Sequence, residues 1–299
     1  MNPYLEDILS QPRFLRRAVE SFPAAALSVI QSSIRNDDID RVILTGMGAS
    51  HNAAYPAVLA MTDLPVPVQL WNSAELVHYL GDMITGRTLL WMNSQSGRSA
   101  ELVHLLEKTG SSIPAVVLAC VNDLDSPLAR ASDICLPILA GPESTVGTKT
   151  YMNTLAVNLL AAYVLAGKDH EALRADLLAA ADTMETYLET MEDRVSSLDK
   201  ALGEFENLIL LGRGASMSSV WNGALINKEA AKYPLEGMNA AEFRHGPLEL
   251  VEKGFSALIL AGSKATSGLN RKMALELRRL GGRAFWIDSE EDAELETIL

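Results

Sequence analysis

Two stretches of the sequence decide the fold: RVILTGMGAS at residues 41–50 and NLILLGRGAS at residues 207–216. Each is an apolar, partly β-branched run that leads into a Gly-x-Gly-Ala-Ser turn. Such a run is typical of a buried parallel strand, and two close glycines let the chain turn sharply into a helix. The second stretch repeats the first 166 residues later, which is too long for a solenoid repeat. We therefore predict a duplicated α/β unit.

The length and charge of the chain limit the possible classes of protein. Its 299 residues are enough for two domains of about 150 residues each, and 48% hydrophobic with 21% charged residues indicates globular units. The formal net charge of −13 argues against nucleic acid and anionic membranes as partners. A phosphate site in such a chain has to rely on local backbone amides and hydroxyls.

The cysteines and the N-terminal region indicate where the protein works. Cys120 and Cys135 lie in the apolar runs VVLAC and ICLPI, as expected of two buried thiols in a reducing compartment. The N-terminus shows no apolar signal core, and polar residues interrupt the longest hydrophobic stretches. We expect a cytoplasmic protein without a membrane span.

The order of the elements predicts the fold class. Residues 3–35 are expected to form helices interrupted by Pro12 and Pro23, and residues 169–204 form an acidic helical linker. Strands are predicted at 41–46, 66–71, 88–93, 115–121, 134–139, 207–212, 256–261 and 283–288, and further helices at 50–61, 73–80, 98–109, 149–167, 216–233 and 267–280. This alternation indicates two α/β units, each a parallel sheet sandwiched by helices.

We place the first domain at residues 1–168 and the second at residues 169–299. The second copy looks short, because only eleven residues follow Asp288. Either its sheet is smaller or the sequence lacks a C-terminal segment.

The strongest chemical signal is NSQSGRSAELVHLLE, residues 93–107. A strand leads into a turn rich in hydroxyls and then into an amphipathic helix. Ser94, Ser96 and Ser99, with Gln95 between them, add side-chain donors to the free amides and positive dipole end of a helix N-terminus. This arrangement predicts a site for a phosphate monoester. The alternative is an ordinary capped turn, since serine is common where helices begin.

The turn at residues 46–50 is its companion. It does not fit a dinucleotide fingerprint, because His51 occupies the sixth position and no ribose-binding acid follows the next strand. We interpret it as a turn that presents Ser50 to the same ligand. At the counterpart of the serine cluster the second copy reads AGSKATSG, residues 261–268, with hydroxyls at a different spacing. One phosphate site, in the first half, is therefore expected.

A third constellation lies in KEAAKYPLEGMNAAEFRHGPLEL, residues 228–250. Glu229 falls late in an apolar-faced helix, and His245 follows in a segment rich in turn formers. A carboxylate and an imidazole suit general acid–base chemistry, although a solvated glutamate and a structural histidine are the plain alternatives. The remaining histidines and the two cysteines lack metal-ligand spacing, so neither a metal nor another cofactor is predicted. No Gly-x-Ser-x-Gly elbow is present, which excludes a serine hydrolase of that type.

Together these motifs resemble the sugar isomerase (SIS) domain family over about residues 35–290. The likeness is greatest to the tandem isomerase half of glucosamine-6-phosphate synthase and to stand-alone amino-sugar-phosphate deaminases and deglycases. It rests on G-x-G-x-S, S-Q-S-G-x-S, T-K, and K-E followed by E-x-x-H-G-P. The resemblance implies tandem flavodoxin-like units.

The resemblance also implies roles for particular residues. Ser94, Gln95, Ser96 and Ser99 would hold the sugar phosphate, with Ser50 nearby. The loop ESTVGTKT, residues 143–150, would line the sugar through Thr145, Gly147 and Thr148. Glu229 would shuttle a proton, and His245 would open the sugar ring. Because that histidine comes from the partner subunit in the family, a homodimer with a shared active site is implied.

Two departures from the synthase pattern bear on the reaction. Ile226 stands where the synthase has a lysine three residues before the glutamate, and the sequence ends at Leu299 without the synthase's lysine-bearing tail. The sequence contains no glutaminase segment, so we expect no local source of ammonia. We therefore expect a glucosamine-6-phosphate-deaminase-like enzyme that gives a ketose phosphate and ammonia. A fructosamine-6-phosphate deglycase and a non-catalytic sugar-phosphate sensor are the alternatives.

Overall fold

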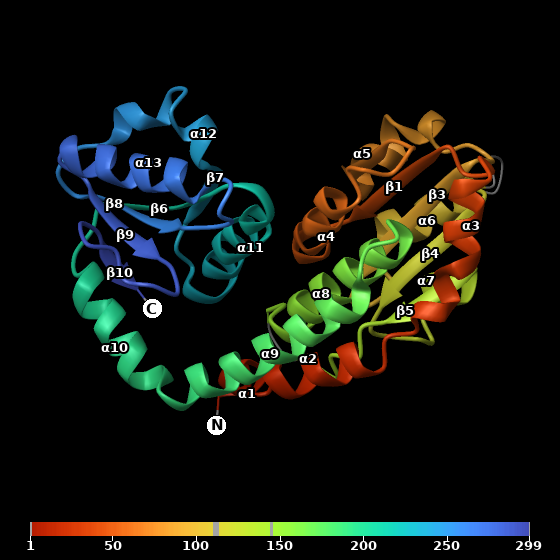
Figure 1. Cartoon of the computed structure of the whole chain (residues 1–299), viewed down its shortest axis with the longest axis horizontal. Coiled ribbons are helices and arrows are strands. Elements are labelled where there is room, and N and C mark those ends of the chain that lie inside the picture. Colours follow the sequence, from red (N-terminus) through yellow and green to blue (C-terminus); the bar gives the residue numbers. More distant parts are fainter. Residues whose placement is uncertain (1, 110–113, 144–145, 299) are drawn as a thin grey trace. The chain divides into compact units, whose positions relative to one another are not determined.

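Two parallel sheets of five strands each organise the chain, one in each half of the sequence (Figure 1). They are seen in a computed structural model that describes residues 2–109, 114–143 and 146–298. The α/β class predicted from the sequence is confirmed. Within these described ranges, no helix combines the length and apolar character needed to cross a membrane.

The first sheet has the strand order β2-β1-β3-β4-β5, with all pairs parallel. Its strands are β1 (Arg41–Gly46), β2 (Val68–Asn72), β3 (Thr88–Ser94), β4 (Val116–Val121) and β5 (Ile134–Pro137). This 2-1-3-4-5 order is that of a flavodoxin-like sheet, in which the direction of strand addition reverses between β1 and β3.

Helices cover both faces of the first sheet, because alternate strand residues point to opposite sides. The helices of this unit are α1 (Pro3–Leu9), α2 (Gln11–Glu20), η1 (Ala24–Leu27), α3 (Ser28–Arg35), α4 (Gly48–Ala60), α5 (Ser73–His78), η2 (Gly81–Met83), α6 (Ala100–Thr109), α7 (Pro127–Ala131), α8 (Lys149–Leu165) and α9 (His170–Glu189). Val42 and Leu44 lie in one buried cluster with α3, α4 and α8, whereas Ile43 lies in another with α5, α6 and α7.

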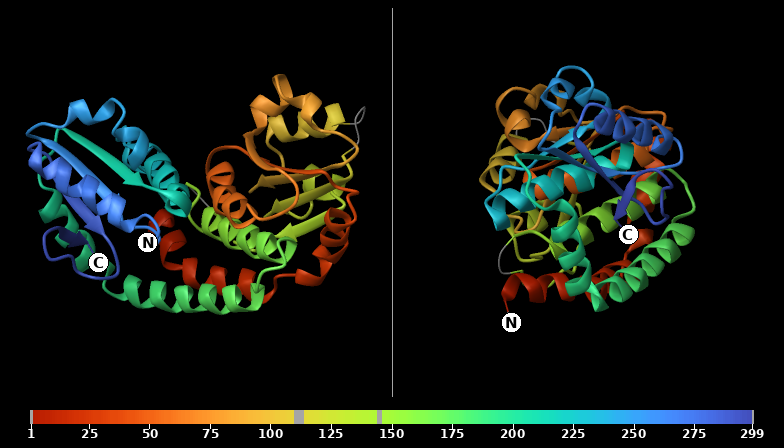
Figure 2. Two further views of the ribbon diagram at one scale, coloured as in Figure 1. Left: turned by 45° about the horizontal axis from the view of Figure 1, so that its top comes forward. Right: turned by 90° about the vertical axis from the view of Figure 1, so that its left-hand side faces the viewer.

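The chain divides into two compact units, residues 1–186 and 187–299. The predicted boundary lay earlier, between residues 168 and 169. Most of α9 goes with the first unit because Leu173 and Ala181 are buried in a cluster with Leu15 of α2 and Leu160 of α8. Figure 2 shows α2 and α9 lying side by side. Residues 169–186 of the predicted linker are therefore part of the first unit, and residues 187–204 belong to the second.

The second sheet has the order β10-β9-β8-β6-β7. Counted from β6, this is again 2-1-3-4-5, with all pairs parallel. Its strands are β6 (Asn207–Gly212), β7 (Glu236–Asn239), β8 (Phe255–Leu260), β9 (Arg283–Ile287) and β10 (Glu296–Ile298). The sheet thus matches the first in strand number, but β10 is short and a loop at residues 288–295 leads into it.

The helices of the second unit are α10 (Met191–Leu202), η3 (Gly214–Ser216), α11 (Met217–Ile226), η4 (Asn227–Ala231), α12 (Ala240–Phe243), η5 (Pro247–Leu250) and α13 (Ser267–Arg279). One face of the sheet packs on α12 and α13, with Phe243 and Met273 fully buried. On the other face, α11 approaches β7 so closely that a Cβ at Gly237 would lie 2.5 Å from the Val220 carbonyl oxygen.

Candidate functional site

A pocket of about 230 Å³ opens at the carboxyl edge of the first sheet. Its lining comes from the start of α4, the turn after β3, the loop before α8 and the first turn of α8: Ala49, Ser50, Gln95, Glu143, Gly147, Thr150 and Tyr151. The chain leaves β1 and β3 on opposite sides of the sheet, so this is its topological switch point. In open α/β sheets, ligands bind in the crevice at that point.

The turn after β3 is held in shape by its own serines. The Gly97 amide donates to the Ser94 hydroxyl at 3.0 Å, and that hydroxyl lies 3.3 Å from the Ser99 hydroxyl. The Arg98 amide donates to the Ser96 hydroxyl at 3.2 Å. Each of the three serines is therefore bonded within the turn, which is formed before a ligand binds.

Gly97 is required at its position. Its φ is +61°, and a Cβ there would lie 2.1 Å from the Ser126 hydroxyl. Its carbonyl accepts from the Leu128 amide at 3.2 Å, which ties the turn to α7. A larger residue would meet both backbone strain and a direct clash.

Arg98 does not supply a free positive charge for an anion. Its guanidinium bonds the Asp123 carboxylate at 2.9 Å and holds the pKa of that carboxyl below its usual value. The donors left for an anion are thus the polar groups of the turn and the first amides of α6, in line with the acidic composition of the chain.

Glu143 lines the pocket on the side of α8 and accepts hydrogen bonds from the start of that helix. One of its carboxylate oxygens, Oε1, accepts from the Thr148 amide at 2.8 Å and the Lys149 amide at 2.7 Å. The same oxygen accepts from the Thr148 hydroxyl at 2.9 Å, and Oε2 accepts from the Thr150 hydroxyl. The carboxylate therefore satisfies the N-terminus of α8, where an anion is electrostatically favoured. Because Glu143 already occupies this helix end, a phosphate is better placed near α6.

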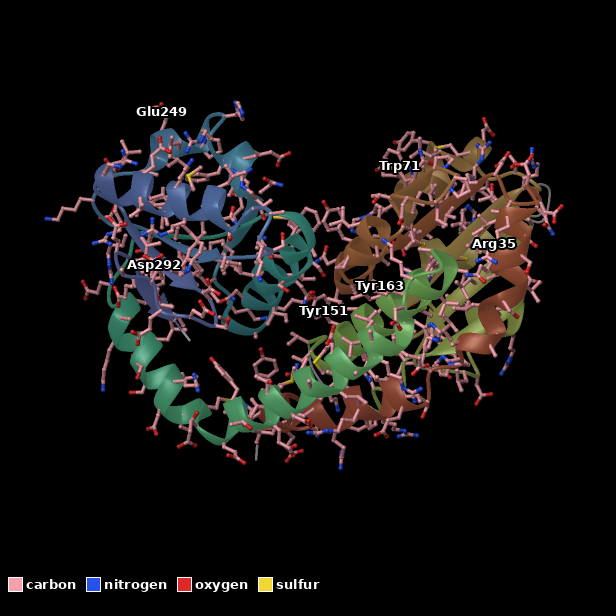
Figure 3. The ribbon with its side chains drawn as sticks, in the orientation of Figure 1. Arg35, Trp71, Tyr151, Tyr163, Glu249 and Asp292 are labelled. Atoms are coloured by element: carbon pink, nitrogen blue, oxygen red, sulfur yellow. The ribbon has the colours of Figure 1, made fainter. Side chains whose placement is uncertain are left out.

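The pocket brings together some of the residues predicted from the sequence. Ser50, Gln95 and Gly147 line it, whereas Ser94, Ser96 and Ser99 belong to the same turn as Gln95 without being part of the lining. Thr145 lies outside the described residues. Tyr151, which is labelled in Figure 3, lies in the first turn of α8 and also lines the pocket.

Glu143, Thr150 and Tyr151 were not among the predicted site residues. The signal for Glu143 was present in the sequence, because an acid that precedes Thr-Lys-Thr at the start of an apolar helix is a good candidate for a capping group.

His51, next to the pocket residue Ser50, is half-buried in α4. Burial lowers the pKa of this imidazole, and a hydrogen bond with Asn52 opposes that shift in part. In the described part of the chain, no group of three or more His, Cys, Asp or Glu side chains could hold a metal ion.

The two residues predicted for acid–base chemistry lie in the second unit. Helix α11 widens after Ile226 into the π-helical turn η4, which contains Glu229 and ends at Lys232 in the left-handed conformation. His245 follows α12, and its amide donates to the Glu242 carbonyl at 2.8 Å. Turns of π-helix are frequent at functional sites.

The sequence places Glu229 late in an apolar-faced helix. In the structure Glu229 is exposed, as are Ala230 and Ala231 beside it in the π-helical turn η4. His245 is also exposed. The second unit by itself therefore encloses neither side chain in apolar surroundings.

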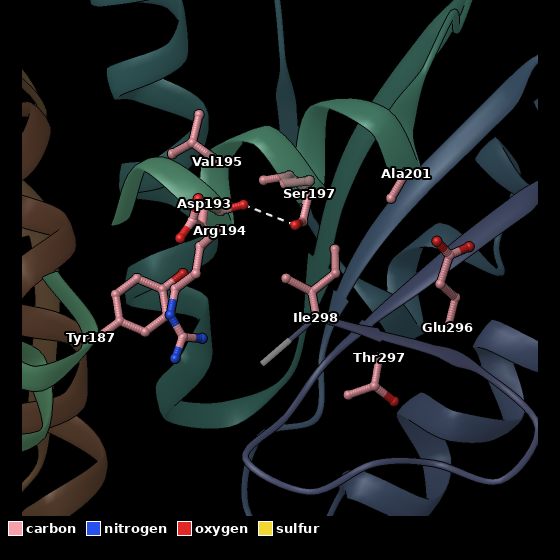
Figure 4. A pocket seen from close by; sticks show the side chains of 10 residues that line it. Tyr187, Asp193, Arg194, Val195, Ser197, Ala201, Glu296, Thr297 and Ile298 are labelled. Atoms are coloured by element: carbon pink, nitrogen blue, oxygen red, sulfur yellow. Dashed lines mark hydrogen bonds between the residues drawn. The ribbon is translucent and has the colours of Figure 1, made fainter. Parts of the chain in front are cut away.

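A larger hollow of about 450 Å³ lies in the second unit between α10 and β10 (Figure 4). The Arg194 guanidinium stacks over the Tyr187 ring at 4.3 Å on one side, and Thr297 and Ile298 form the other. It contains none of the hydroxyl-rich turns and lies beside the short edge strand, so size alone does not make it the better candidate. The pocket at the switch point of the first sheet lies beside the hydroxyl-rich turn after β3 and is therefore the better candidate for an anion site.

Comparison with known families agrees with this location. Residues 37–164 match the family described as SIS domain. They form an SIS domain. The match begins just before β1 and ends within α8, so this SIS domain contains the whole first sheet and the pocket. The family resemblance inferred from the sequence is confirmed.

Among curated proteins, glutamine–fructose-6-phosphate aminotransferase (isomerizing) of Pyrococcus horikoshii is 29% identical over 299 residues. The alignment covers 98% of this chain and 49% of that protein. The chain with its SIS domain therefore spans about half the length of the curated relatives it matches.

Solved structures extend the likeness over both units. A Silicibacter pomeroyi protein, provisionally assigned as a phosphosugar isomerase, is 26% identical with a TM-score of 0.82, covering 100% of this chain and 90% of that one. Glucosamine-6-phosphate deaminase from Thermotoga maritima is 20% identical with a TM-score of 0.78, covering 96% and 85%. At that identity, the second likeness shows the fold alone.

Proposed function

We propose that this chain is a phosphosugar isomerase that acts on an amino sugar phosphate and releases its amine, in the manner of a glucosamine-6-phosphate deaminase. The observation that carries the proposal is the pocket at the switch point of an SIS domain, where Ser50 and Gln95 meet Gly147. The second unit, with its equal strand order, would be a second SIS domain.

The phosphate of the substrate would bind at the turn formed by Ser94, Gln95, Ser96 and Ser99. This turn is preformed and precedes α6, whose first amides are available to an anion. The Glu143 side of the pocket is negatively charged and suits the hydroxyl and amino groups of the sugar. The sugar would thus be oriented with its phosphate away from Glu143.

The reaction would proceed in five steps after binding. The ring opens with help from His245, Glu229 takes a proton from C2, and the proton returns at C1 to give an imine at C2. Water then adds to C2, the C2–N bond breaks, and ammonia leaves with fructose 6-phosphate. A carboxylate suits the shuttle because it can act as a base and then as an acid. Overall, glucosamine 6-phosphate and one water give fructose 6-phosphate and ammonia, so the reaction requires no oxidant or reductant.

Both catalytic residues would act in a homodimer that shares its active sites, at a cytoplasmic location. The exposure of Glu229 and His245 supports this, since an exposed pair needs another surface to become enclosed. Mixing inactive Glu229→Gln chains with inactive His245→Asn chains should restore part of the activity. No recovery in confirmed heterodimers would place both residues in the site of one subunit.

Turnover tests the proposal against its alternatives. We expect glucosamine 6-phosphate to give fructose 6-phosphate and equal amounts of ammonia, with kcat reduced by roughly two to four orders of magnitude in Glu229→Gln. Turnover of a fructosamine 6-phosphate instead would identify a deglycase. Tight binding of the sugar phosphates without any turnover would identify a sensor and contradict the enzyme proposal.

A further inference from the structure

A buried ion pair joins the N-terminal helix to the start of α8. Asp7 is the one buried residue of α1, and Lys149 is the first residue of α8. Their side chains are 7% and 4% exposed, and the Lys149 Nζ lies 2.7 Å from the Asp7 Oδ1. Removing two charges from water is expensive, so such a pair is weak evidence for stability and is better explained by the geometry it fixes.

The Lys149 ammonium makes two further contacts that point to the pocket. It donates to the Pro142 carbonyl at 2.7 Å, and Pro142 immediately precedes Glu143 in the pocket wall. It also lies 4.7 Å from the centre of the Phe14 ring of α2. One charged group therefore connects α1, α2 and the segment that leads into the pocket.

Phe14 and two asparagines fasten the same segment from other directions. A Cβ at Gly141, whose φ is +68°, would lie 2.6 Å from the Phe14 ring, so the ring packs directly on this glycine. The side-chain amide of Asn153 donates through Nδ2 to the Phe14 and Ile138 carbonyls at 3.0 and 2.7 Å. The side-chain amide of Asn122 donates to the Gly141 carbonyl at 2.7 Å.

We propose that Asp7 and Lys149 are positioning residues for sugar-phosphate binding, and that α1 and α2 form a structural part of the pocket although they lie outside the matched SIS segment. Asp7 fixes the Lys149 ammonium, the ammonium holds Pro142, and Pro142 sets where the Glu143 carboxylate stands. This role rests on the proposed function for its ligand. The placement of the Glu143 carboxylate can be measured without any ligand.

The ligand-free test is amide hydrogen exchange of the full chain. The amides of Thr148 and Lys149 donate to Glu143, so their protection reports whether its carboxylate is in place. We expect at least tenfold faster exchange at these amides in Asp7→Asn. We expect the same in Phe14→Leu, a variant that leaves the Asp7–Lys149 ion pair intact but removes the ring that packs on Gly141. Asp292→Asn, which breaks the 2.6 Å contact with Arg271 in the second unit, is the matched control and should leave both amides unchanged.

The functional test uses the double variant Asp7→Asn/Lys149→Met, which leaves no unpaired charge in the interior. We expect it to fold, to raise the KM for glucosamine 6-phosphate about tenfold or more, and to change kcat less than about twofold. Unchanged exchange at Thr148 and Lys149 in the single variants, or an unchanged KM in the double variant, would overturn the positioning role. Failure of the wild-type chain to bind any sugar phosphate would overturn the proposed function. The exchange result would still decide whether Asp7 and Lys149 position the Glu143 carboxylate.

Discussion

Replacing Glu143 by alanine should destabilise the first unit far more than the loss of a surface carboxylate. Glu143 accepts two backbone amides of α8, at 2.8 and 2.7 Å, together with hydroxyls of Thr148 and Thr150. Thr148, Lys149 and Thr150 are all buried, so water reaches the freed donors only through the pocket. Losing a helix-capping side chain costs about 1–2 kcal/mol, and each unsatisfied buried donor adds about 1–3 kcal/mol.

Allowing for water that enters the pocket, we expect Glu143→Ala to lower the free energy of unfolding by about 3 kcal/mol. Glu143→Gln keeps an acceptor oxygen but loses the charge, so its effect should be about 1 kcal/mol. Urea unfolding followed by circular dichroism measures both.

Glu171→Ala is the matched control, because this glutamate also stands near the N-terminus of a helix, in the first turn of α9. Its side chain is 65% exposed, and its ion pairs with His170 and Arg174 measure 3.4 and 3.7 Å. We expect a change below about 0.5 kcal/mol. Equal losses in Glu143→Ala and Glu171→Ala would refute the capping role of Glu143.

Three further predictions concern the pocket and its surroundings. Gly147→Val should raise the KM for sugar phosphates about tenfold or more in steady-state assays, because a Cβ there already lies 3.6 Å from a side chain of α4 and a branched residue would fill the pocket. Gly97→Ala should lower the unfolding free energy by more than about 2 kcal/mol in urea titrations, since its φ is +61° and its Cβ would meet a hydroxyl at 2.1 Å. The pKa of His51 is lower in the fold than its ordinary 6.5, so the unfolded chain binds more protons as the pH falls below about 6.5. Stability should therefore fall from there towards the folded pKa, and His51→Gln should flatten that slope in unfolding experiments repeated at several pH values.

The parts of the fold that local sequence determines could be predicted. The strands at Arg41–Gly46 and Asn207–Gly212 have the predicted bounds, because an apolar run and two glycines act within ten residues of each other. The turn at residues 94–99 was found for the same reason: its serines bond groups of the same turn.

The parts that depend on distant contacts could not be predicted. Strand β7 contains only one large apolar residue, Met238, and it forms by pairing with β6, where Gly237 lets α11 come close. The π-helical turn η4, which contains Glu229, continues directly from the end of α11, and no local sequence signal marks the change of helix type. Likewise, nothing near Asp7 in the sequence indicates that its partner is Lys149, because the fold alone brings them together.

The most direct test of the central claim is to locate the ligand by nuclear magnetic resonance. Backbone amide shifts of the full chain would be followed while glucosamine 6-phosphate is added, with unphosphorylated glucosamine as the matched control. We predict that the phosphorylated sugar alone shifts the amides of residues 95–99 strongly, together with those of Gly147 and Thr150 across the pocket. Shifts confined to the hollow between α10 and β10, or equal responses to both sugars, would contradict a phosphate site at the switch point of the first sheet.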